Sequence, residues 1–136
     1  MRGRQRFNAI THKDSGQLYD VMALGLSSPE AAALSRFEMQ DLATVTTVDP
    51  GNEVMATGFP GLADAPIAPS TLQARVDRID GASVQLTEPG VPGYSGSALM
   101  CSRGLVGILH GDVGAESNLT NALALSFEVL RSELFR

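Results

Sequence analysis

The segment 71–87 constrains the fold most, because it has the pattern of two amphipathic strands joined by a tight turn. Residues 71–79 alternate between apolar and polar side chains, and residues 83–87 alternate again after Asp80-Gly81. A period of two is typical of strands with one buried face, and Asp-Gly is a strong two-residue hairpin turn. The sequence therefore predicts an antiparallel hairpin. The side chains of its first strand predicted to face inward are Leu72, Ala74 and Val76.

Short apolar or β-branched stretches bounded by turn residues recur along the chain, which indicates further strands. The stretch 18–24 is apolar enough to be buried on both faces. A tight turn is predicted at Asp49-Pro50-Gly51-Asn52, with Gly51 in the left-handed region that favours glycine. The further predicted strands cover residues 5–11, 18–24, 44–48, 53–59, 104–111 and 118–123, together with the apolar run after Ser97.

Two short helices are predicted outside the strands. Ser28-Pro29-Glu30 has the residues of a helix start, with Ser28 as the N-cap and an acidic residue in the first turn. From Ser126 onward, apolar residues recur at helical spacing and predict a closing helix. Several short antiparallel strands closed by a helix indicate a small β-barrel.

Length and composition are those of an ordinary globular domain. The 136 residues suffice for one domain with a single core, and the apolar share of 43% is ordinary. Asp, Arg or Gly interrupts every apolar segment before it reaches the length of a membrane span. The basic start, residues 1–6, lacks the apolar core of a signal peptide, which slightly favours a cytoplasmic location.

Charge and cysteine usage argue against several kinds of partner. The net charge of −5 argues against nucleic acid, because phosphate binding needs clustered Lys and Arg. Cys101 is the single cysteine, so no disulfide can form within the chain. No cluster of Cys and His has zinc spacing. We therefore expect no metal or other cofactor, and neither nucleic acid nor a membrane as a partner.

The segment Gly93-Tyr94-Ser95-Gly96-Ser97 places a serine between two glycines, directly before an apolar run. The glycines allow a tight bend that presents backbone N–H groups outward, a conformation that is costly for residues with a Cβ. A serine on such a bend can serve both nucleophilic attack and oxyanion binding. An ordinary loop has the same composition, since Gly and Ser dominate turns. The nucleophile elbow of α/β-hydrolases is set aside, because it needs Gly-x-Ser-x-Gly before a helix.

This serine loop, the strand after it and the run containing Val106-Gly107-Ile108 resemble the nucleophile region of trypsin-like (chymotrypsin-fold) serine proteases. Residues 53–61, with their Gly-Phe-Pro ending, resemble the first strand of the second barrel in bacterial members. Asp20-Val21-Met22-Ala23-Leu24 resembles the segment that carries the triad aspartate. Asp41-Leu42-Ala43 has the same short pattern but lies too close to residues 58–60 for the linker between the barrels.

The resemblance implies an all-β fold with a six-stranded antiparallel Greek-key β-barrel, the second barrel of the trypsin-like fold, a C-terminal helix and an incomplete first barrel. Residues 1–48 would hold the remnant of the first barrel, the linker and a short helix. Residues 49–136 would form the barrel that carries the nucleophile loop and the closing helix.

The resemblance also implies a serine endopeptidase that acts on a polypeptide substrate. Ser95 would attack the scissile carbonyl, and Asp20 would orient a histidine base. The backbone N–H groups of Gly93 and Ser95 would form the oxyanion hole.

Substrate contacts are implied on both sides of this loop. Val91 and Pro92 would form one wall of the pocket for the substrate side chain, and His110 and Gly111 would line the cleft. Relatives with a histidine in this strand carry it at the position of Leu109, and a shift of one residue reverses the face. The segment before Ser95 contains no Asp, so a small or apolar side chain is expected rather than Arg or Lys.

The sequence departs from the family at the base. The family's catalytic histidine lies well before the aspartate, whereas only 19 residues precede Asp20. His12 lacks the family context and is expected in an exposed loop. The resemblance therefore covers residues 18–136 and implies an N-terminally truncated domain. We expect this chain to be nearly inert by itself, because a seryl hydroxyl without a base is a poor nucleophile.

Two further interpretations stay open. The chain is a non-catalytic, protease-like binding module, or an unrelated small barrel in which the serine segment is only a turn. A lone second barrel would also expose the apolar face that packs on the first barrel, so we expect self-association.

Overall fold

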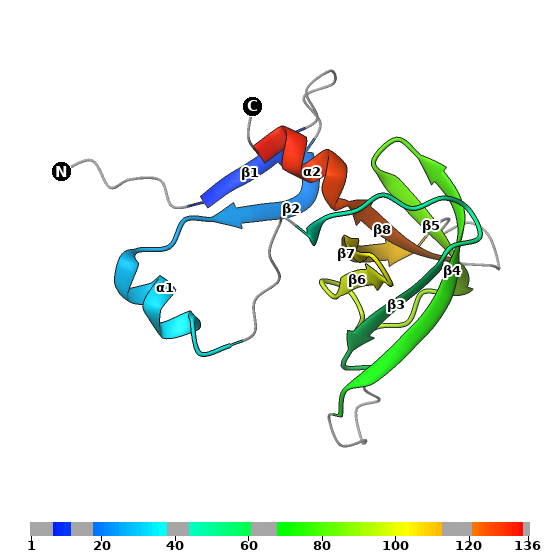
Figure 1. Cartoon of the computed structure of the whole chain (residues 1–136), viewed down its shortest axis with the longest axis horizontal. Coiled ribbons are helices and arrows are strands. Elements are labelled where there is room, and N and C mark those ends of the chain that lie inside the picture. The colour runs from blue at the N-terminus through cyan, green and yellow to red at the C-terminus, as the bar shows by residue number, and fades with distance from the viewer. Residues whose placement is uncertain (1–6, 12–17, 38–43, 61–67, 113–120, 135–136) are drawn as a thin grey trace.

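A computed structural model describes residues 7–11, 18–37, 44–60, 68–112 and 121–134. The first part of the chain is a two-stranded antiparallel sheet, in which β1 (Phe7–Thr11) pairs with β2 (Leu18–Leu24). Helix α1 (Ser28–Leu34) follows and lies away from the rest of the fold (Figure 1).

The second part of the chain is a closed, all-antiparallel barrel of six strands. The strands are β3 (Glu53–Gly58), β4 (Ser70–Asp80), β5 (Ser83–Pro89), β6 (Ala98–Cys101), β7 (Gly104–Asp112) and β8 (Asn121–Ser126). Around the barrel their order is β3-β4-β5-β8-β7-β6, and helix α2 (Phe127–Leu134) follows β8 in the chain. The predicted fold class, a six-stranded antiparallel barrel with a C-terminal helix, is therefore confirmed.

The hairpin predicted from alternation is present as β4 and β5. Gly81 sits in the turn with φ +57°, and Val76 and Leu86 are paired and buried inside the barrel. The predicted turn before β3 is also present, with Gly51 at φ +90°. Both elements depend on short-range signals, which explains why the sequence alone predicts them.

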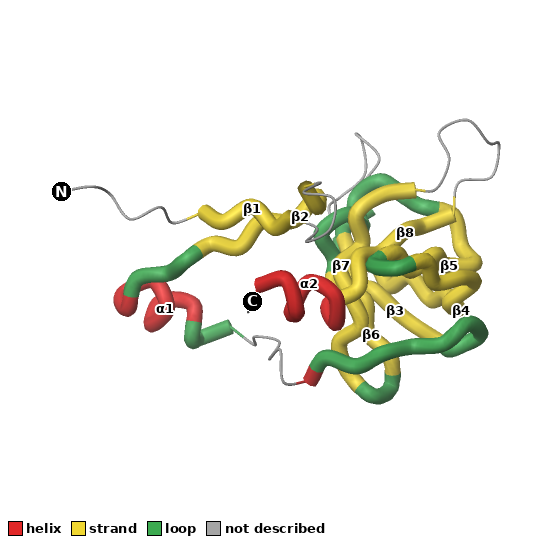
Figure 2. The backbone as a smooth tube through the Cα atoms, turned by 90° about the horizontal axis from the view of Figure 1, so that it is seen from above, coloured by secondary structure: helices red, strands yellow, loops and turns green. Residues whose placement is uncertain are grey.

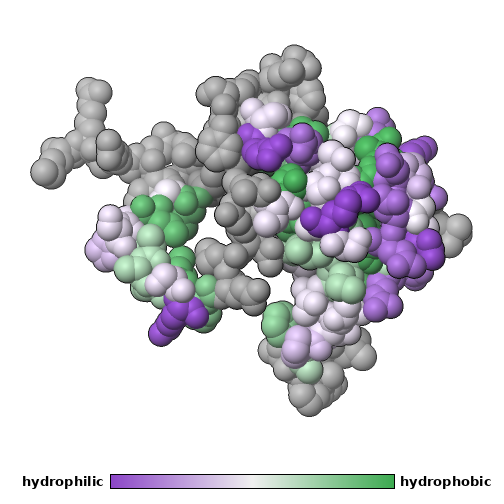
Figure 3. All heavy atoms as spheres, viewed as in Figure 1, coloured by the Kyte–Doolittle hydropathy of each residue, from purple (hydrophilic) through white to green (hydrophobic). Residues whose placement is uncertain are grey.

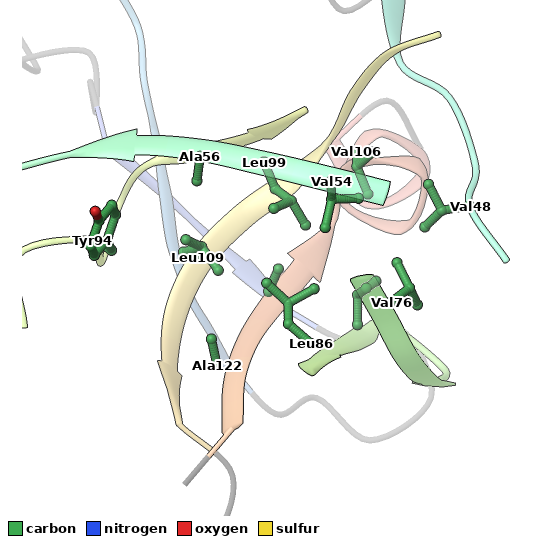
Figure 4. Packing of buried hydrophobic residues seen from close by; sticks show 12 residues of the cluster. Val48, Val54, Ala56, Val76, Leu86, Tyr94, Leu99, Val106, Leu109 and Ala122 are labelled. Carbon is green, nitrogen blue, oxygen red and sulfur yellow. The ribbon is translucent and has the colours of Figure 1, made fainter. Parts of the chain in front are cut away.

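The barrel interior is a single apolar cluster, to which all six strands and two flanking residues contribute (Figure 4). Leu86 and Ala124 are fully buried, and Leu99 is 1% exposed. Tyr94, from the serine loop, lies at one edge of the labelled side chains in Figure 4 and is only 6% exposed. The serine loop is therefore anchored in the barrel core by its own aromatic residue.

Helix α2 joins the two parts of the fold. It contacts β7 and β8 on the barrel and also contacts β1, and it lies between the β1–β2 sheet and the barrel (Figure 2). Leu130 of α2 and Leu125 of β8 form a second buried cluster, against which Val21 of β2 and Ile108 of β7 pack. No helix in the described ranges is long and apolar enough to cross a membrane.

Two predicted details of the first half of the chain are wrong. The N-cap of α1 is Ser27 rather than Ser28, because the carboxylate of Glu30 accepts hydrogen bonds from the Ser27 N–H (2.8 Å) and hydroxyl (2.9 Å). The prediction that the strand 18–24 is buried on both faces is wrong at its end, where Leu24 is 50% exposed.

Two predicted strands differ from those observed. Residues 44–48 do not form a strand but make one parallel bridge, between Val45 and Leu105, and Val48 then enters the barrel core. The last strand continues to Ser126, three residues past its predicted end at Leu123, and residues 118–120 lie outside the described ranges. In both places, the partner strand rather than the local sequence decides where pairing occurs.

Apolar side chains are exposed around α1. Leu24, Leu26 and Phe37 are each more than two-fifths exposed, and the helix buries none of its residues. Figure 3 shows this apolar surface (green) on the arm that carries α1, beside polar side chains. The first part of the chain therefore presents apolar surface that the described residues do not cover.

Candidate active site

Ser95 lies on the loop between β5 and β6, and its side chain is exposed. Two overlapping turns shape this loop: the Tyr94 N–H donates to the carbonyl of Val91 (3.3 Å), and the Ser97 N–H donates to that of Tyr94 (2.9 Å). Gly93 has φ +101° and Gly96 has φ +86°, which L side chains rarely adopt. The two glycines of the motif are therefore required by the backbone on both sides of the serine.

Hydrogen bonds fasten the loop to strands on both sides. The Phe59 N–H, just beyond β3, donates to the carbonyl of Gly93 (3.1 Å). Toward β7, the Gly96 N–H donates to the carbonyl of Leu109 (2.6 Å), and the Leu109 N–H donates to that of Ser97 (2.9 Å). The position of Ser95 is thus fixed by the barrel.

Close backbone packing explains the Gly-Phe-Pro segment at the end of β3. A Cβ on Gly93 would lie 2.7 Å from the Cα of Pro60 and would also meet the Phe59 carbonyl. A Cβ on Gly58 would lie 2.7 Å from Cδ1 of Tyr94 and 2.9 Å from Oγ of Ser97. Real Cβ atoms almost never approach so closely, so both positions require glycine.

The loop leaves three polar groups without partners among the described residues: the N–H groups of Gly93 and Ser95 and the Ser95 hydroxyl. Exposed backbone donors beside a hydroxyl are what acyl transfer needs, because they can stabilise negative charge that develops on a carbonyl oxygen. The loop can therefore offer a nucleophile and two oxyanion donors within three residues.

A cavity of about 260 Å³ opens beside Ser95. The predicted wall residues Val91 and Pro92 line it together with Ser95. Gly90, in the same predicted wall segment, and Tyr94, in the serine loop, also line it. Sequence reasoning missed Leu72, Leu109 and Ala122, because these residues come from other strands of the barrel.

His110 is not among the residues that line this cavity. Leu109 lines it and is 3% exposed, whereas the Nε2 atom of His110 is buried without a hydrogen-bond partner among the described residues. Gly111 pairs with Leu123 in the ladder, and the register shifts between Leu109 and Gly111. The structure thus does not bring His110 to the Ser95 hydroxyl.

Asp20 belongs to β2, where only its backbone is described. Its neighbour Val21 packs against the cluster of Leu125 and Leu130, which places β2 against the outside of the barrel. His12 and Asp41 lie outside the described residues. Within the described ranges, no imidazole is therefore hydrogen-bonded to Ser95.

A larger hollow of about 710 Å³ shares no lining residue with the cavity at Ser95. It is lined by side chains of both charges, including Arg75 and Glu53, which form an exposed ion pair (2.9 Å). No group of three or more His, Cys, Asp or Glu side chains that could hold a metal ion occurs in the described part of the chain. The loop and cavity at Ser95 are therefore the candidate site.

Comparison with known proteins supports the fold of this site. The chain is similar to the crystal structure of the MamO protease domain from Magnetospirillum magneticum, with 25% sequence identity and a TM-score of 0.52. The match covers 74% of this chain but only 56% of that one, so the chain spans little more than half of its structural relative. No protein-family model and no curated protein matches the sequence. The barrel, with its serine loop, thus has the fold of one barrel of a trypsin-like protease domain.

Proposed function

We propose that this chain is part of a trypsin-like serine endopeptidase in which Ser95 is the nucleophile. The observation that carries the proposal is the exposed Ser95 hydroxyl beside two N–H groups that have no partner among the described residues. The similarity to a protease domain supports the same interpretation.

In the proposed reaction, Oγ of Ser95 forms a bond to the scissile carbonyl carbon, and its proton passes to an imidazole base. The carbonyl oxygen becomes negative and is received by the N–H groups of Gly93 and Ser95, each worth on the order of 100- to 1,000-fold in rate. The C–N bond then breaks as the imidazolium returns its proton to the leaving amine. Water hydrolyses the acyl-serine by the same sequence of transfers.

The proposal assigns the base to an imidazole outside the described residues. Without a base, a seryl hydroxyl is a weak nucleophile at neutral pH, and catalysis falls to roughly 10³–10⁴ over water. Asp20, on β2, is the proposed carboxylate that orients this imidazole, as it would in the resembling proteases.

A second candidate function is a non-catalytic peptide-binding module. It is favoured because no imidazole among the described residues is hydrogen-bonded to Ser95: Nε2 of His110 is buried and has no partner in that part of the chain. Both functions use the same loop and cavity, but they differ in whether Ser95 reacts.

The test is labelling of the full chain with a fluorophosphonate in the presence of free imidazole, which supplies the base from solution. We expect an adduct at Ser95, detected by intact mass and peptide mapping, with a rate that rises with imidazole concentration. Ser95→Ala should abolish the adduct. Ser97→Ala is the matched control, because Ser97 lies on the same loop, and it should keep the adduct.

Two results would overturn the peptidase proposal. One is a folded chain in which Ser95 is not labelled at any imidazole concentration, and the other is equal labelling of Ser95 in the folded and the denatured chain. The binding module would then be the better explanation.

A further inference from the structure

Strand β4 is longer than both of its neighbours in the barrel and pairs with each of them over a different half. Its first half, residues 70–75, pairs with β3, whereas its pairing with β5 begins only at Val76. Figure 1 shows the first half of β4 beside β3. On the side away from β3, this half of the strand has no partner strand among the described residues.

Hydrogen bonds in the middle of β4 show which backbone groups point to that side. The N–H and the carbonyl of Val76 are both bonded to the turn before β3 (2.9 and 2.7 Å). The N–H of Arg75 points the other way and donates to Oγ1 of Thr87 on β5 (3.1 Å). Because alternate residues of a strand point their backbone groups to the same side, the N–H and C=O groups of Thr71 and Gln73 also point away from β3. We call these four groups the open edge of β4.

Pro89 explains why β5 does not cover the open edge. If the antiparallel register of the hairpin continued past Leu86, Pro89 would lie opposite Gln73. The residue at that position must donate an N–H to the Gln73 carbonyl, and proline has none. Pro89 instead pairs with Asn121 of β8. The sequence thus ends the β4–β5 ladder and leaves the backbone groups of the open edge available to another strand.

The open edge lies between the two hollows of the barrel. Leu72 and the segment 90–92 line the cavity at Ser95. Gln73 and Glu88 line the separate hollow of about 710 Å³. Because successive residues of a strand point to opposite faces, a strand added at the open edge would direct its side chains alternately toward the two hollows.

The charges in the larger hollow indicate which kind of strand fits. Four charged residues line it, and Arg75 is paired there with Glu53 (2.9 Å). Arg103 donates to the carbonyl of Thr47 (2.8 Å). Glu88 is exposed and makes no hydrogen bond or ion pair with any residue that the structure describes. A cationic side chain on the added strand would gain Glu88 as a partner, whereas a carboxylate would be repelled.

We propose that the open edge of β4 binds an extended segment of a partner polypeptide, which adds a strand to the barrel and carries a lysine or arginine close to Glu88. Backbone hydrogen bonds to Thr71 and Gln73 supply the affinity, and the side chains that face the hollows supply the specificity. This inference goes beyond the proposed function, because it requires neither a reactive Ser95 nor an imidazole base.

The first test uses the full chain and a fluorescent peptide, Thr-Val-Thr-Lys-Thr-Val, blocked at both ends. We expect saturable binding in fluorescence anisotropy, together with slower hydrogen exchange of the Thr71 and Gln73 amides. Methylation of the peptide's backbone nitrogens should weaken binding at least about 10-fold, because each hydrogen bond is worth roughly 2- to 12-fold in affinity. Replacement of the peptide's lysine by glutamate should weaken binding at least about 2-fold.

Variants of the chain locate the binding on the open edge. Gln73→Pro removes one N–H of the edge but none of the bonds to β3, and it should weaken binding by roughly 10-fold, because the ring also obstructs the peptide. Gln73→Ala is the matched control, since it keeps the N–H, and it should bind as the unaltered chain does. Glu88→Gln should remove the difference between the lysine and glutamate peptides. The methylated peptide tests the unaltered chain, so the proposal stays falsifiable if Gln73→Pro fails to fold.

The outcomes separate this inference from the proposed function. Binding that is lost in Gln73→Pro but kept in Gln73→Ala, in a chain whose Ser95 is never labelled, would support the inference and refute the peptidase. Absence of binding, equal binding of the methylated peptide, or binding unchanged by Gln73→Pro would refute the inference and leave the peptidase standing. If Gln73→Pro abolished self-association while no peptide bound, the edge would pair with a second copy of the chain, and the inference would be wrong.

Discussion

The contact between Gly93 and the segment after β3 predicts a large difference between two otherwise similar glycines of the serine loop. Gly93 and Gly96 both have positive φ, +101° and +86°, so alanine at either position meets the same backbone strain. A Cβ on Gly96 has nothing within 4 Å, whereas a Cβ on Gly93 would lie 2.7 Å from the Cα of Pro60 and meet the Phe59 carbonyl. Gly96→Ala is therefore the control for Gly93→Ala.

The expected magnitudes follow from these two terms. Left-handed backbone costs an L residue roughly 1–2 kcal/mol, which should be the whole loss for Gly96→Ala. Overpacking against a backbone that cannot move aside adds about 1–3 kcal/mol for Gly93→Ala. At about 4 °C per kcal/mol for a chain of this size, Tm should fall by about 4–8 °C for Gly96→Ala and about 8–20 °C for Gly93→Ala.

Reactivity should separate the same two variants further. Relief of the clash at Gly93 requires its peptide plane to move, which displaces a proposed oxyanion donor worth on the order of 100-fold or more in rate. The Gly96 N–H already donates to the Leu109 carbonyl (2.6 Å) and is no such donor. Calorimetry and imidazole-assisted labelling of Ser95 measure both effects. Equal losses of Tm in the two variants, or equal labelling rates, would refute the reasoning.

Three other expectations concern the rest of the fold. Leu130→Ala should lower the free energy of unfolding by about 2–5 kcal/mol in urea titrations, because Leu130 is 1% exposed and fills the cluster under α2; a change below 1 kcal/mol would contradict that packing. Arg75→Gln should change stability by less than about 1 kcal/mol, because its ion pair with Glu53 is exposed; the same titrations decide. We also propose that the chain self-associates through the exposed apolar surface around α1, which includes Leu34 and Phe37. Sedimentation should show a concentration-dependent dimer that Leu34→Glu with Phe37→Glu weakens, and a strict monomer would contradict the proposal.

The elements predicted correctly from the sequence are those whose signals are local. The β4–β5 hairpin needs only alternation and Asp80-Gly81, and both lie within one short segment. The start of α1 differs from its prediction by one residue although its signal is also local: Ser27 and Glu30 have the three-residue spacing of a capping box, which identifies Ser27 as the cap.

The strand boundaries that differ from the prediction depend on partners far away in the chain. Strand β8 lies between β5 and β7, so its end at Ser126, three residues past the predicted Leu123, is set by pairing with those strands and not by local propensity. Val45 pairs only with Leu105, and the chain then turns inward at Val48. A β-branched run predicts a strand at 44–48, but it does not say whether a neighbour is free to pair.

The candidate site likewise has one part with a local sequence signal and one part that depends on distant strands. The serine loop is visible in the sequence because Gly93 and Gly96 flank Ser95 at positive φ, where L side chains are strained. The cavity is not visible, because Leu72 and Ala122 come next to Ser95 only when the barrel closes. The sequence therefore reveals the serine loop more easily than the cavity beside it.

The forces that hold the serine loop explain why one scaffold supports both proposed functions. Its shape comes from the buried ring of Tyr94, the bond from the Phe59 N–H and the two bonds between the loop and β7, none of which involves a histidine or an aspartate. A base can therefore be lost or supplied from elsewhere without collapse of the loop, the free amides or the cavity. Peptide binding beside the serine loop should accordingly persist in every variant that keeps the contact between Gly93 and Phe59, whereas reaction at Ser95 should follow the availability of an imidazole. If peptide affinity and the labelling rate of Ser95 changed together as imidazole is added or withheld, the base would also shape the loop.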